Sequence, residues 1–315
     1  MNVLTFTLKK IKHLIVIEGP TASGKTSISV QLAKHFKTCI LSADSRQFYK
    51  EIAIGTAKPS PEEQDGIKHY FIDSHNLEDE VTSAQYEKEA LTILQDEFKS
   101  REIIILTGGS GMFIDALCIG LDNIPSSIEL KTSIQGEFDL HGITPLLNEL
   151  EQADLQYFNE VDKNNIPRVI RAIEAIRLTG KKYSELRKSK PKERPFEIHR
   201  FVLNHERQIL YDRINKRVDT MVQEGLIEEA KSVEHLKHLT SLNTVGYKEL
   251  FSFFNGEISK ERAIELIKQN SRRYAKRQIT WFKRHSESKW IDFQSIEQSI
   301  QDISSSFNES RSLME

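Results

Sequence analysis

Cysteine is scarce in this chain of 315 residues, which contains only Cys39 and Cys118. Both lie in apolar stretches of sequence, and neither has a histidine or a second cysteine at the spacing of a metal site. Neither a zinc site nor a disulfide framework is therefore indicated. We expect both cysteines to be buried thiols of the hydrophobic core.

Long hydrophobic runs are also missing. No stretch approaches the roughly 18 consecutive apolar residues that a membrane span requires. Residues 1–13 lack the apolar centre and the small-residue cleavage site of a signal peptide. With 38% hydrophobic and 29% charged residues, the composition is that of an ordinary globular protein. We expect a cytoplasmic protein without a membrane attachment.

Three short apolar runs predict buried strands, because they are continuous, rich in β-branched residues and bounded by turn signals. They span residues 14–17, 38–41 and 103–106. Amphipathic helical patterns lie between them, which favours a three-layer α/β fold around a parallel sheet. Small polar residues follow each run directly, beginning at Gly19, Ser42 and Gly108. Since ligands of such sheets bind beyond the carboxyl ends of the strands, these loops define one candidate site.

The pattern changes after residue 121, where helical periodicity and many charges replace the strand-like runs. We interpret residues 122–199 as an inserted helical subdomain. Its clearest helix has Pro167 in the first turn and Gly180 as its stop signal. Strand character returns at residues 200–203, so the core is expected to comprise residues 1–121 and 200–295.

Two long helices are predicted in the second part of this core, over about residues 207–233 and 260–284. Both segments repeat apolar residues at helical spacing. Residues 296–315 form a C-terminal tail that is rich in serine. We expect this tail to fray from Asp302 onward.

A phosphate-loop pattern, GxxxxGKT, lies between the first predicted strand and a predicted helix. It consists of Gly19, Pro20, Thr21, Ala22, Ser23, Gly24, Lys25 and Thr26. The glycines let backbone N–H groups and a helix N-terminus point at a phosphate, while Lys25 adds a positive charge. The hydroxyl of Thr26 is a ligand for Mg²⁺, which we expect as the cofactor. The loop does not distinguish a nucleotide such as ATP from the diphosphate of another leaving group.

Basic residues are concentrated in two windows, although the net charge of the whole chain is only −2. Residues 163–194 hold eleven Lys or Arg against three Asp or Glu, and residues 271–290 hold seven against one. Either window by itself is equally well explained as a solvated helix face. Two such windows in a chain with a phosphate loop favour a polyanionic partner.

Five segments together resemble the tRNA dimethylallyltransferases in order and in spacing. They are residues 19–26, 42–50, 54–59, 108–111 and 275–284. The block from Asp44 to Pro59 discriminates most, because many unrelated NTPases share the phosphate loop. The resemblance implies a nucleotide-kinase-like fold whose phosphate loop holds dimethylallyl diphosphate. It also implies transfer of the dimethylallyl group to the N6 amine of the adenine 3′ of the tRNA anticodon, with release of diphosphate.

The sequence departs from the family pattern at a few positions. Ser110 stands where the family usually has Thr, Phe113 where Tyr is common, and Lys131 is the nearest match to an Arg at the start of the insertion. The first two departures leave the fold secure and put one tRNA contact in doubt. Two cysteines cannot build the C-terminal zinc finger of many eukaryotic members, so the bacterial type is closer. We expect a monomer.

Asp44 is the candidate catalytic base. The exocyclic amine of adenine is a poor nucleophile, and its attack on the allylic carbon requires a group that accepts its proton. The alternative from the sequence is that Asp44 caps a helix. The resemblance adds Thr21 and Arg217 as contacts of the diphosphate. Arg213 and Arg217 lie four residues apart on one helix face, which taken alone is more often a solvated face.

The resemblance also implies tRNA contacts in three places. Against the target nucleotide we expect Asp44, Ser45, Arg46, Gln47 and Ser110. The insertion contributes Lys131, Pro167, Arg168, Val169, Ile170 and Arg171 against the anticodon loop. Contacts to the stem come from Asn243, Gly246, Tyr247, Lys248, Lys276, Arg277, Gln278 and Lys283. We interpret the neighbouring Trp281 and Phe282 as core residues.

Two rival functions share parts of this pattern. A small-molecule or nucleotide kinase would use the same loop with Arg217 as a lid arginine, but it would not explain both basic windows. A non-catalytic RNA-binding protein gated by a nucleotide would not need Asp44 at the edge of the sheet.

Overall fold

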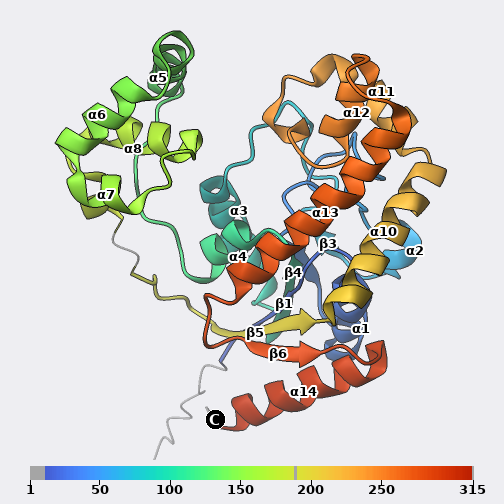
Figure 1. Ribbon diagram of the computed structural model, residues 1–315. Coiled ribbons are helices and arrows are strands. Elements are labelled where there is room, and N and C mark those ends of the chain that lie inside the picture. The colour runs from blue at the N-terminus through green and yellow to red at the C-terminus, as the bar shows by residue number, and fades with distance from the viewer. Residues whose placement is uncertain (1–10, 188–189, 314–315) are drawn as a thin grey trace, which may run out of the picture. The chain divides into compact units, whose positions relative to one another are not determined.

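The computed structural model describes residues 11–187 and 190–313, and its helices and strands are labelled in Figure 1. These residues form two compact units. The larger unit contains the residues up to Cys118 and from Arg194 onward, and the smaller unit is Ile119–Glu193. No helix in the described ranges is both long enough and apolar enough to cross a lipid bilayer.

The bounds of the smaller unit differ from the predicted insertion at residues 122–199. Its two ends are joined by a backbone hydrogen bond of 2.7 Å from Lys192 to the carbonyl oxygen of Ile119. Just beyond, the guanidinium of Arg194 donates to Glu87 and to the carbonyl oxygen of Ala116, both at 2.8 Å. These bonds attach the chain from residue 194 onward to the larger unit.

A parallel sheet of six strands forms the centre of the larger unit, in the order β3-β2-β4-β1-β5-β6. The strands are β1 (His13–Glu18), β2 (Ile40–Ser42), β3 (His69–Tyr70), β4 (Ile103–Gly108), β5 (Glu197–Asn204) and β6 (Lys289–Asp292). The α/β class, the three strands predicted from apolar runs and the strand near residue 200 are confirmed. β3 and β6 lie outside the predictions because neither contains a continuous apolar run.

The register of the sheet brings the ends of three strands together. Glu18, the last residue of β1, pairs with Gly108 of β4. Ser42, the last residue of β2, pairs with Thr107 of β4. The loops that follow β1, β2 and β4 therefore leave the same edge of the sheet, as the sequence predicts.

Both faces of β1 are covered, since all six of its residues are buried. On one face, Ile15 and Ile17 pack against Ile28 of α1 (Lys25–Phe36) and against Phe307 of α14 (Ile296–Ser312). Cys39 and Cys118 are buried free thiols, which confirms their interpretation as core residues.

The C-terminal segment is a helix of the core and not a frayed tail, so that prediction is wrong. In α14, Ile303 and Phe307 are fully buried. Ile296 and Ile300 pack against the same cluster, and the side chain of Ser295 caps the helix by accepting from the N–H of Gln298 at 3.1 Å. The apolar residues recur at helical spacing between serines and polar residues, which gives the helix a narrow packing face within a polar sequence.

The predicted helix over residues 207–233 is in fact two helices, α10 (Arg207–Gln223) and α11 (Leu226–Ser232). Gly225 lies between them with φ of +105°, a conformation that glycine adopts without strain. The chain can therefore turn at this point. The prediction of a helix near residues 260–284 is confirmed by α13 (Lys260–Phe282), which is capped by Ser259.

The remaining helices of the larger unit surround the sheet and its loops. They are α2 (Pro61–Gln64), α3 (Ser83–Glu97), α4 (Gly111–Cys118) and α12 (Tyr247–Phe254), with short 3-10 turns η1 (Glu234–Leu236) and η2 (Thr240–Leu242). A second hydrophobic cluster joins α10, α11, α12 and α13, with Val218, Leu226, Leu250 and Ile267 at its centre.

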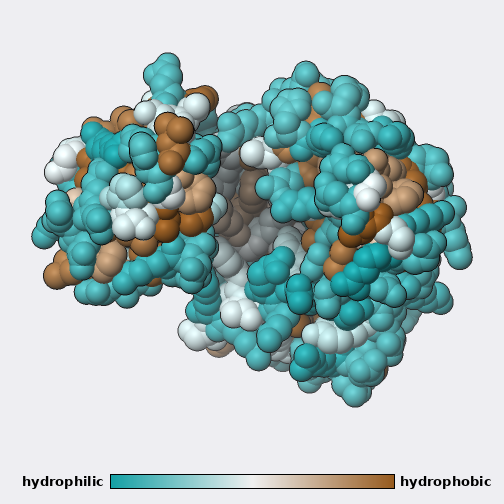
Figure 2. All heavy atoms as spheres, turned by 45° about the horizontal axis from the view of Figure 1, so that its top comes forward, coloured by the Kyte–Doolittle hydropathy of each residue, from teal (hydrophilic) through white to brown (hydrophobic). Residues whose placement is uncertain are grey.

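The smaller unit consists of helices α5 (Ile128–His141), α6 (Thr144–Ala153), α7 (Leu155–Glu160), α8 (Ile166–Thr179) and α9 (Tyr183–Leu186). Its core contains Ile134, Leu150, Val169 and Ile173. α8 begins at Ile166 with Asn165 as its cap and ends before Gly180, whose φ is +65°, as predicted. Figure 2 shows hydrophobic side chains scattered among hydrophilic ones on the surface of this unit.

Candidate functional site

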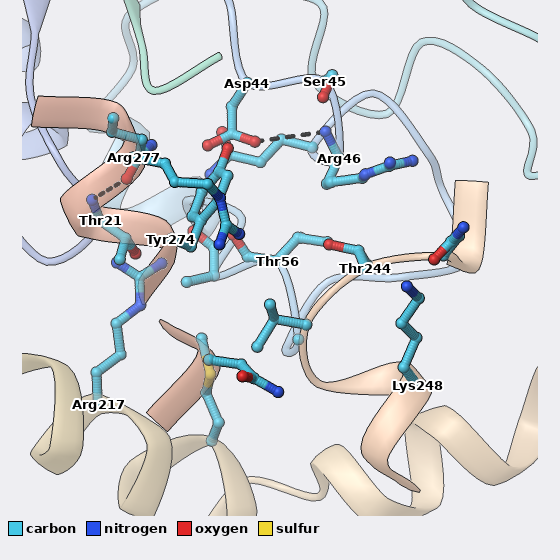
Figure 3. A pocket seen from close by; sticks show the side chains of 18 of the residues that line it. Thr21, Asp44, Ser45, Arg46, Thr56, Arg217, Thr244, Lys248, Tyr274 and Arg277 are labelled. Carbon is cyan, nitrogen blue, oxygen red and sulfur yellow. Dashed lines mark hydrogen bonds between the residues drawn. The ribbon is translucent and has the colours of Figure 1, made fainter. Parts of the chain in front are cut away.

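A cavity of about 430 Å³ lies in the larger unit, at the edge of the sheet where the predicted site loops meet (Figure 3). Five parts of the chain line it: the phosphate loop with the start of α1, the segment 44–57, α10, the residues before and within α12, and α13. The lining residues are Thr21, Lys25, Thr26, Asp44, Ser45, Arg46, Gln47, Gly55, Thr56, Ala57, Arg217, Met221, Asn243, Thr244, Val245, Lys248, Glu249, Asn270, Tyr274, Arg277 and Gln278.

The phosphate loop is held open by backbone geometry. Gly24 has φ of +89° and precedes the first residue of α1, so the helix N-terminus begins at Lys25. At Gly19, a Cβ atom would lie 2.6 Å from the Oγ of Ser23, which leaves no room for a side chain. This arrangement of glycines and a helix N-terminus is suited to binding a phosphate group.

Side chains from two other helices hold the outer edge of the loop. Gln278 of α13 accepts a hydrogen bond from the N–H of Thr21 at 2.9 Å and donates to the carbonyl oxygen of Gly109 at 2.8 Å. Arg213 of α10 donates to the carbonyl oxygen of Ala22 at 2.8 Å. Gln278 is buried, so its role in the structure is to connect two loops of the site.

Two cations face one carboxylate across the cavity. Burial lowers the pKa of Lys25 to about 8, an effect that Asp44 opposes and the nearby Arg217 reinforces. Burial also lowers the pKa of Arg217, and Asp44 again opposes this shift. Because both cations respond to Asp44, the carboxylate lies within electrostatic reach of the phosphate loop.

Asp44 lies in a turn directly after β2. Its Oδ1 accepts a long hydrogen bond of 3.4 Å from the N–H of Arg46, and its carbonyl oxygen accepts from the N–H of Gln47 at 3.0 Å. Residues 45–48 form a turn and not a helix, so Asp44 does not cap a helix here. Figure 3 shows the carboxylate near Tyr274 and Arg277 at the cavity.

Arg213 and Arg217 lie on the same side of α10, but their guanidinium groups reach different parts of the site. Arg217 lines the cavity, whereas the guanidinium of Arg213 contacts the phosphate loop and lies 5.5 Å from the ring of Phe293. Ile214 and Val218 of the same helix are buried. Met221 packs against the hydrophobic cluster of these helices and also lines the cavity.

Several lining residues lie outside the sequence-based selection, notably Thr56, Thr244, Asn270 and Tyr274. Although Tyr274 is 36% exposed, desolvation of its hydroxyl by the surrounding protein raises its pKa to about 12, and the charge of Asp44 adds to this effect. The phenol is therefore protonated at neutral pH. Thr56 falls within the segment 54–59 and Tyr274 directly precedes the segment 275–284, so the segments that carry the family resemblance point to both residues.

Of the residues expected against the target nucleotide, Asp44, Ser45, Arg46 and Gln47 line the cavity. Ser110 lies behind them, where its hydroxyl accepts from the N–H of Ser45 at 3.0 Å. The guanidinium of Arg46 donates to the carbonyl oxygen of Ser241 at 2.8 Å.

The residues expected against the stem divide into three groups. Asn243, Lys248, Arg277 and Gln278 line the cavity. Lys276 and Lys283 are exposed on or just after α13. Gly246 and Tyr247 are buried, so the side chain of Tyr247 has no surface to offer a partner.

Phe282 is fully buried, as expected of a core residue. Trp281 donates from Nε1 to Asp115 at 2.7 Å and packs closely against Gly111. Trp281 therefore contributes to the packing of α13 against α4.

In the smaller unit, the predicted residues also separate by burial. Lys131, Pro167 and Arg168 are exposed, whereas Val169 and Ile170 lie in the hydrophobic core. Arg171 donates to the carbonyl oxygens of Pro125 at 2.9 Å and Ile124 at 2.8 Å, and it pairs with Glu174 at 2.6 Å. Its guanidinium therefore supports the segment before α5.

A parallel sheet with a phosphate loop, and a cavity that places a carboxylate opposite that loop, define a P-loop enzyme of the nucleotide-kinase-like class. The family model described as IPP transferase matches residues 47–285. "tRNA dimethylallyltransferase 2" of Parabacteroides distasonis is 47% identical over 282 residues, which are 89% of this chain and 94% of that protein. "tRNA dimethylallyltransferase 1" of Bacteroides thetaiotaomicron is 48% identical over 279 residues, 88% of this chain and 91% of that protein.

Solved structures agree with this assignment. The full-length tRNA isopentenylpyrophosphate transferase of Bacillus halodurans has a TM-score of 0.71 and 33% identity, covering 96% of this chain and 99% of that one. A eukaryotic dimethylallyltransferase, crystallised in snapshots of its action on tRNA, has a TM-score of 0.75 and 26% identity, covering 91% of this chain and 75% of that one. The chain belongs to the IPP transferase family, the tRNA dimethylallyltransferases, and is a tRNA-modifying transferase.

Proposed function

We propose that this enzyme transfers the dimethylallyl group of dimethylallyl diphosphate to the N6 amine of the adenine 3′ of the anticodon in tRNA, and releases diphosphate. The observation that carries the assignment of roles is the position of Asp44, which faces the same cavity as Lys25 and Arg217 of the phosphate-binding side. A proton acceptor and a leaving-group site are thus within one cavity.

The donor binds with its diphosphate in the phosphate loop. Lys25, the loop N–H groups and Arg217 stabilise the negative charge that grows on the diphosphate as the allylic C–O bond breaks. Thr21, at the mouth of the loop, contacts the same group. These groups bind the transition state more strongly than the ground state, because negative charge develops on the leaving diphosphate as the bond breaks.

The hydroxyl of Thr26 fits a role as ligand of Mg²⁺, because it is a hard oxygen donor that lines the cavity beside the phosphate loop. Mg²⁺ commonly binds through one or two protein oxygens together with phosphates and water. Among the described residues there is no cluster of three or more His, Cys, Asp or Glu that would hold a metal by itself. When bound, the ion would neutralise charge on the diphosphate.

The acceptor adenine leaves its stack in the anticodon loop and enters from the side of residues 44–47. Its N6 forms a bond to the allylic carbon while the bond from that carbon to the diphosphate oxygen breaks. The amine proton passes to the carboxylate of Asp44. The protonated hydroxyl of Tyr274, beside Asp44, supplies a hydrogen-bond donor at this end of the cavity.

The tRNA is held by exposed basic residues of both units, as a monomeric complex in the cytoplasm. Lys131 and Arg168 belong to the smaller unit, and Lys248, Lys276 and Lys283 to the larger. Such side chains bind phosphates and fix the register of the RNA, whereas the cavity selects the base.

One experiment separates this function from its rivals. The protein is incubated with Mg²⁺, unmodified tRNA and either dimethylallyl diphosphate or ATP, and the tRNA nucleosides are analysed by mass spectrometry. Dimethylallyl adenosine formed only with dimethylallyl diphosphate supports the proposal. ATP consumption without modified adenosine would support a kinase, and tRNA binding without consumption of either donor would support a binding protein.

A further inference from the structure

A carboxylate on α11 lies behind the wall of the cavity and takes no part in the transfer. Glu229 accepts four hydrogen bonds, two on each oxygen. Its Oε2 accepts from the N–H groups of Ala53 at 2.7 Å and Ile54 at 2.8 Å. Its Oε1 accepts from the N–H of Gly55 at 2.8 Å and from the hydroxyl of Tyr247 at 2.5 Å.

The segment that Glu229 holds, residues 53–57, belongs to no helix or strand, so its N–H groups lack the hydrogen bonds of regular secondary structure. Three successive N–H groups, those of Ala53, Ile54 and Gly55, all point to this one carboxylate. The N–H groups of Ile54 and Gly55 are partly buried, and an N–H group shielded from water needs an acceptor, so the carboxylate stabilises the loop in this position. The loop has little freedom to adjust, because Ala57 already has φ of +44°.

The same segment is bonded to the turn that carries the catalytic base. Gly55, Thr56 and Ala57 line the cavity. The carbonyl oxygens of Thr56 and Ala57 accept from the Nε2 of Gln47 at 3.3 and 3.1 Å. Gln47 in turn bonds through its N–H to the carbonyl oxygen of Asp44 at 3.0 Å. Glu229 is therefore linked to the Asp44 turn through the backbone of residues 53–57 and the hydrogen bonds of Gln47.

Tyr247 completes the arrangement from the other side. Its side chain is fully buried, and it fills the space beside Gly55, where an added Cβ would lie 2.5 Å from its oxygen. Burial raises the pKa of its hydroxyl, and the charge of Glu229 adds to this shift, so it stays a hydrogen-bond donor. The family-based expectation of a direct tRNA contact at Tyr247 thus gives way to a contact with Glu229.

We propose that Glu229 is a positioning residue for the acceptor cavity: it fixes residues 53–57 against the Asp44 turn, and Tyr247 fixes Glu229. The role rests on the proposed function, since it takes this cavity as the site where the adenine meets Asp44. It predicts that loss of the carboxylate slows the chemical step more than it weakens tRNA binding.

The variant Glu229→Gln tests this directly. Its amide nitrogen cannot accept a hydrogen bond, so the two donors that face that position lose their acceptor. We expect the single-turnover rate at saturating tRNA to fall roughly 10–100-fold, because a displacement of about 1 Å at the reacting groups has an effect of this size. The dissociation constant for tRNA should change less than about threefold, since phosphate contacts dominate affinity.

Two further variants act as controls. Glu228→Gln removes the same charge from the neighbouring, exposed position of α11, and it should keep the wild-type rate. Tyr247→Phe leaves three of the four donors on Glu229 and should slow the reaction by a smaller factor. The double variant Glu229→Gln with Tyr247→Phe should be no slower than Glu229→Gln alone, because Tyr247 acts through Glu229.

Circular dichroism at the temperature of the rate measurements reports the folded fraction of each variant. A folded Glu229→Gln variant with the wild-type rate would overturn the proposal, as would a rate loss that merely follows the unfolded fraction. If Glu229→Gln does not fold, Tyr247→Phe decides, since a folded protein with an undiminished rate rejects the role. A wild-type protein that transfers no dimethylallyl group would instead reject the proposed function, and this role with it.

Discussion

At the scale of single residues, the electrostatics of the site combine two partly desolvated cations with one carboxylate. Lys25 and Arg217 are cations whose pKa values burial lowers, and the carboxylate of Asp44 opposes that shift in both. A diphosphate in the phosphate loop would add negative charge on the same side and further favour the cationic forms. The position of Asp44 opposite these cations is the basis of its proposed role as the proton acceptor.

The variant Asp44→Asn should keep the fold and tRNA affinity while losing most turnover. Asparagine preserves the shape of the side chain but cannot accept the amine proton, and loss of a general base typically costs ~10²–10⁴-fold. Single-turnover rates measure the effect, with Asp212→Asn on the exposed side of α10 as the matched control. A loss of less than about tenfold, short of that range, would reject Asp44 as the base.

Lys25 leads to a prediction about pH. Its pKa of about 8 is below the ordinary value, so the free enzyme loses this positive charge as the pH rises through about 8. We expect kcat/KM for dimethylallyl diphosphate to fall above this pH, provided that the charge assists departure of the diphosphate. Lys25→Arg should move the fall to higher pH, and Lys25→Ala should lower kcat more than donor affinity. A pH profile of Lys25→Ala that matches the wild type would contradict this assignment.

At the scale of secondary-structure elements, strands and loops were more predictable than the surface of the helices. The strands that end at Glu18, Ser42 and Gly108 carry continuous apolar runs, and such runs give a signal that depends only on neighbouring residues. The phosphate loop is predictable for the same reason. The use of an arginine is not local: Arg171 bonds to carbonyl groups of residues 124 and 125, far away in sequence.

Only arginines and lysines that do not hold the fold together are suitable for testing the contacts with tRNA phosphates. Arg171 should be left intact, because its replacement would remove internal bonds of the smaller unit. The triple variant Arg168→Ala, Lys276→Ala, Lys283→Ala removes exposed cations from both units. If each side chain contacts one phosphate, the slope of log affinity against log salt should flatten by roughly 2–3.

The control for this variant removes the same charge elsewhere. The control variant carries Lys88→Ala, Lys99→Ala and Lys260→Ala, three substitutions at exposed positions outside the cavity. It should have the same salt slope as the wild type. Filter binding of tRNA over a series of salt concentrations provides the measurement. A triple variant with the wild-type slope would show that these cations only solvate helix faces.

At the scale of the whole molecule, the least predictable features are those made by segments distant in sequence. The cavity combines residues 21–57 with residues 217–278, and Tyr274 enters it only because α13 crosses the ends of the strands. Likewise, the serine-rich segment of α14 gains stability by placing Phe307 against β1 and β5, which its own composition does not reveal. Local sequence patterns therefore predict helices and strands, whereas the cavity and the core depend on how these elements pack together.

The contact of α14 with the sheet leads to a prediction about stability. His13 of β1 and His199 of β5 lie with ring nitrogens 3.1 Å apart, and Phe307 packs edge-on to both rings. Burial lowers the pKa of His199 to about 4, with His13 and then Lys289 adding to the effect. The folded state thus holds His199 neutral, whereas the unfolded chain binds a proton below its ordinary pKa of about 6.5.

Since the unfolded chain binds more protons between about pH 6.5 and pH 4, the free energy of unfolding should be fully present above pH 6.5 and decline below it. A shift of this size corresponds to roughly 2–3 kcal/mol lost near pH 4. Urea unfolding at pH 7.5 and pH 5 measures the decline in the wild type and in His199→Asn. The variant should be less stable at pH 7.5 but depend less on pH, whereas His238→Asn, at an exposed position, should follow the wild type. Equal pH dependence in the wild type and His199→Asn would show that the buried histidine pair does not set acid sensitivity, and that other groups do.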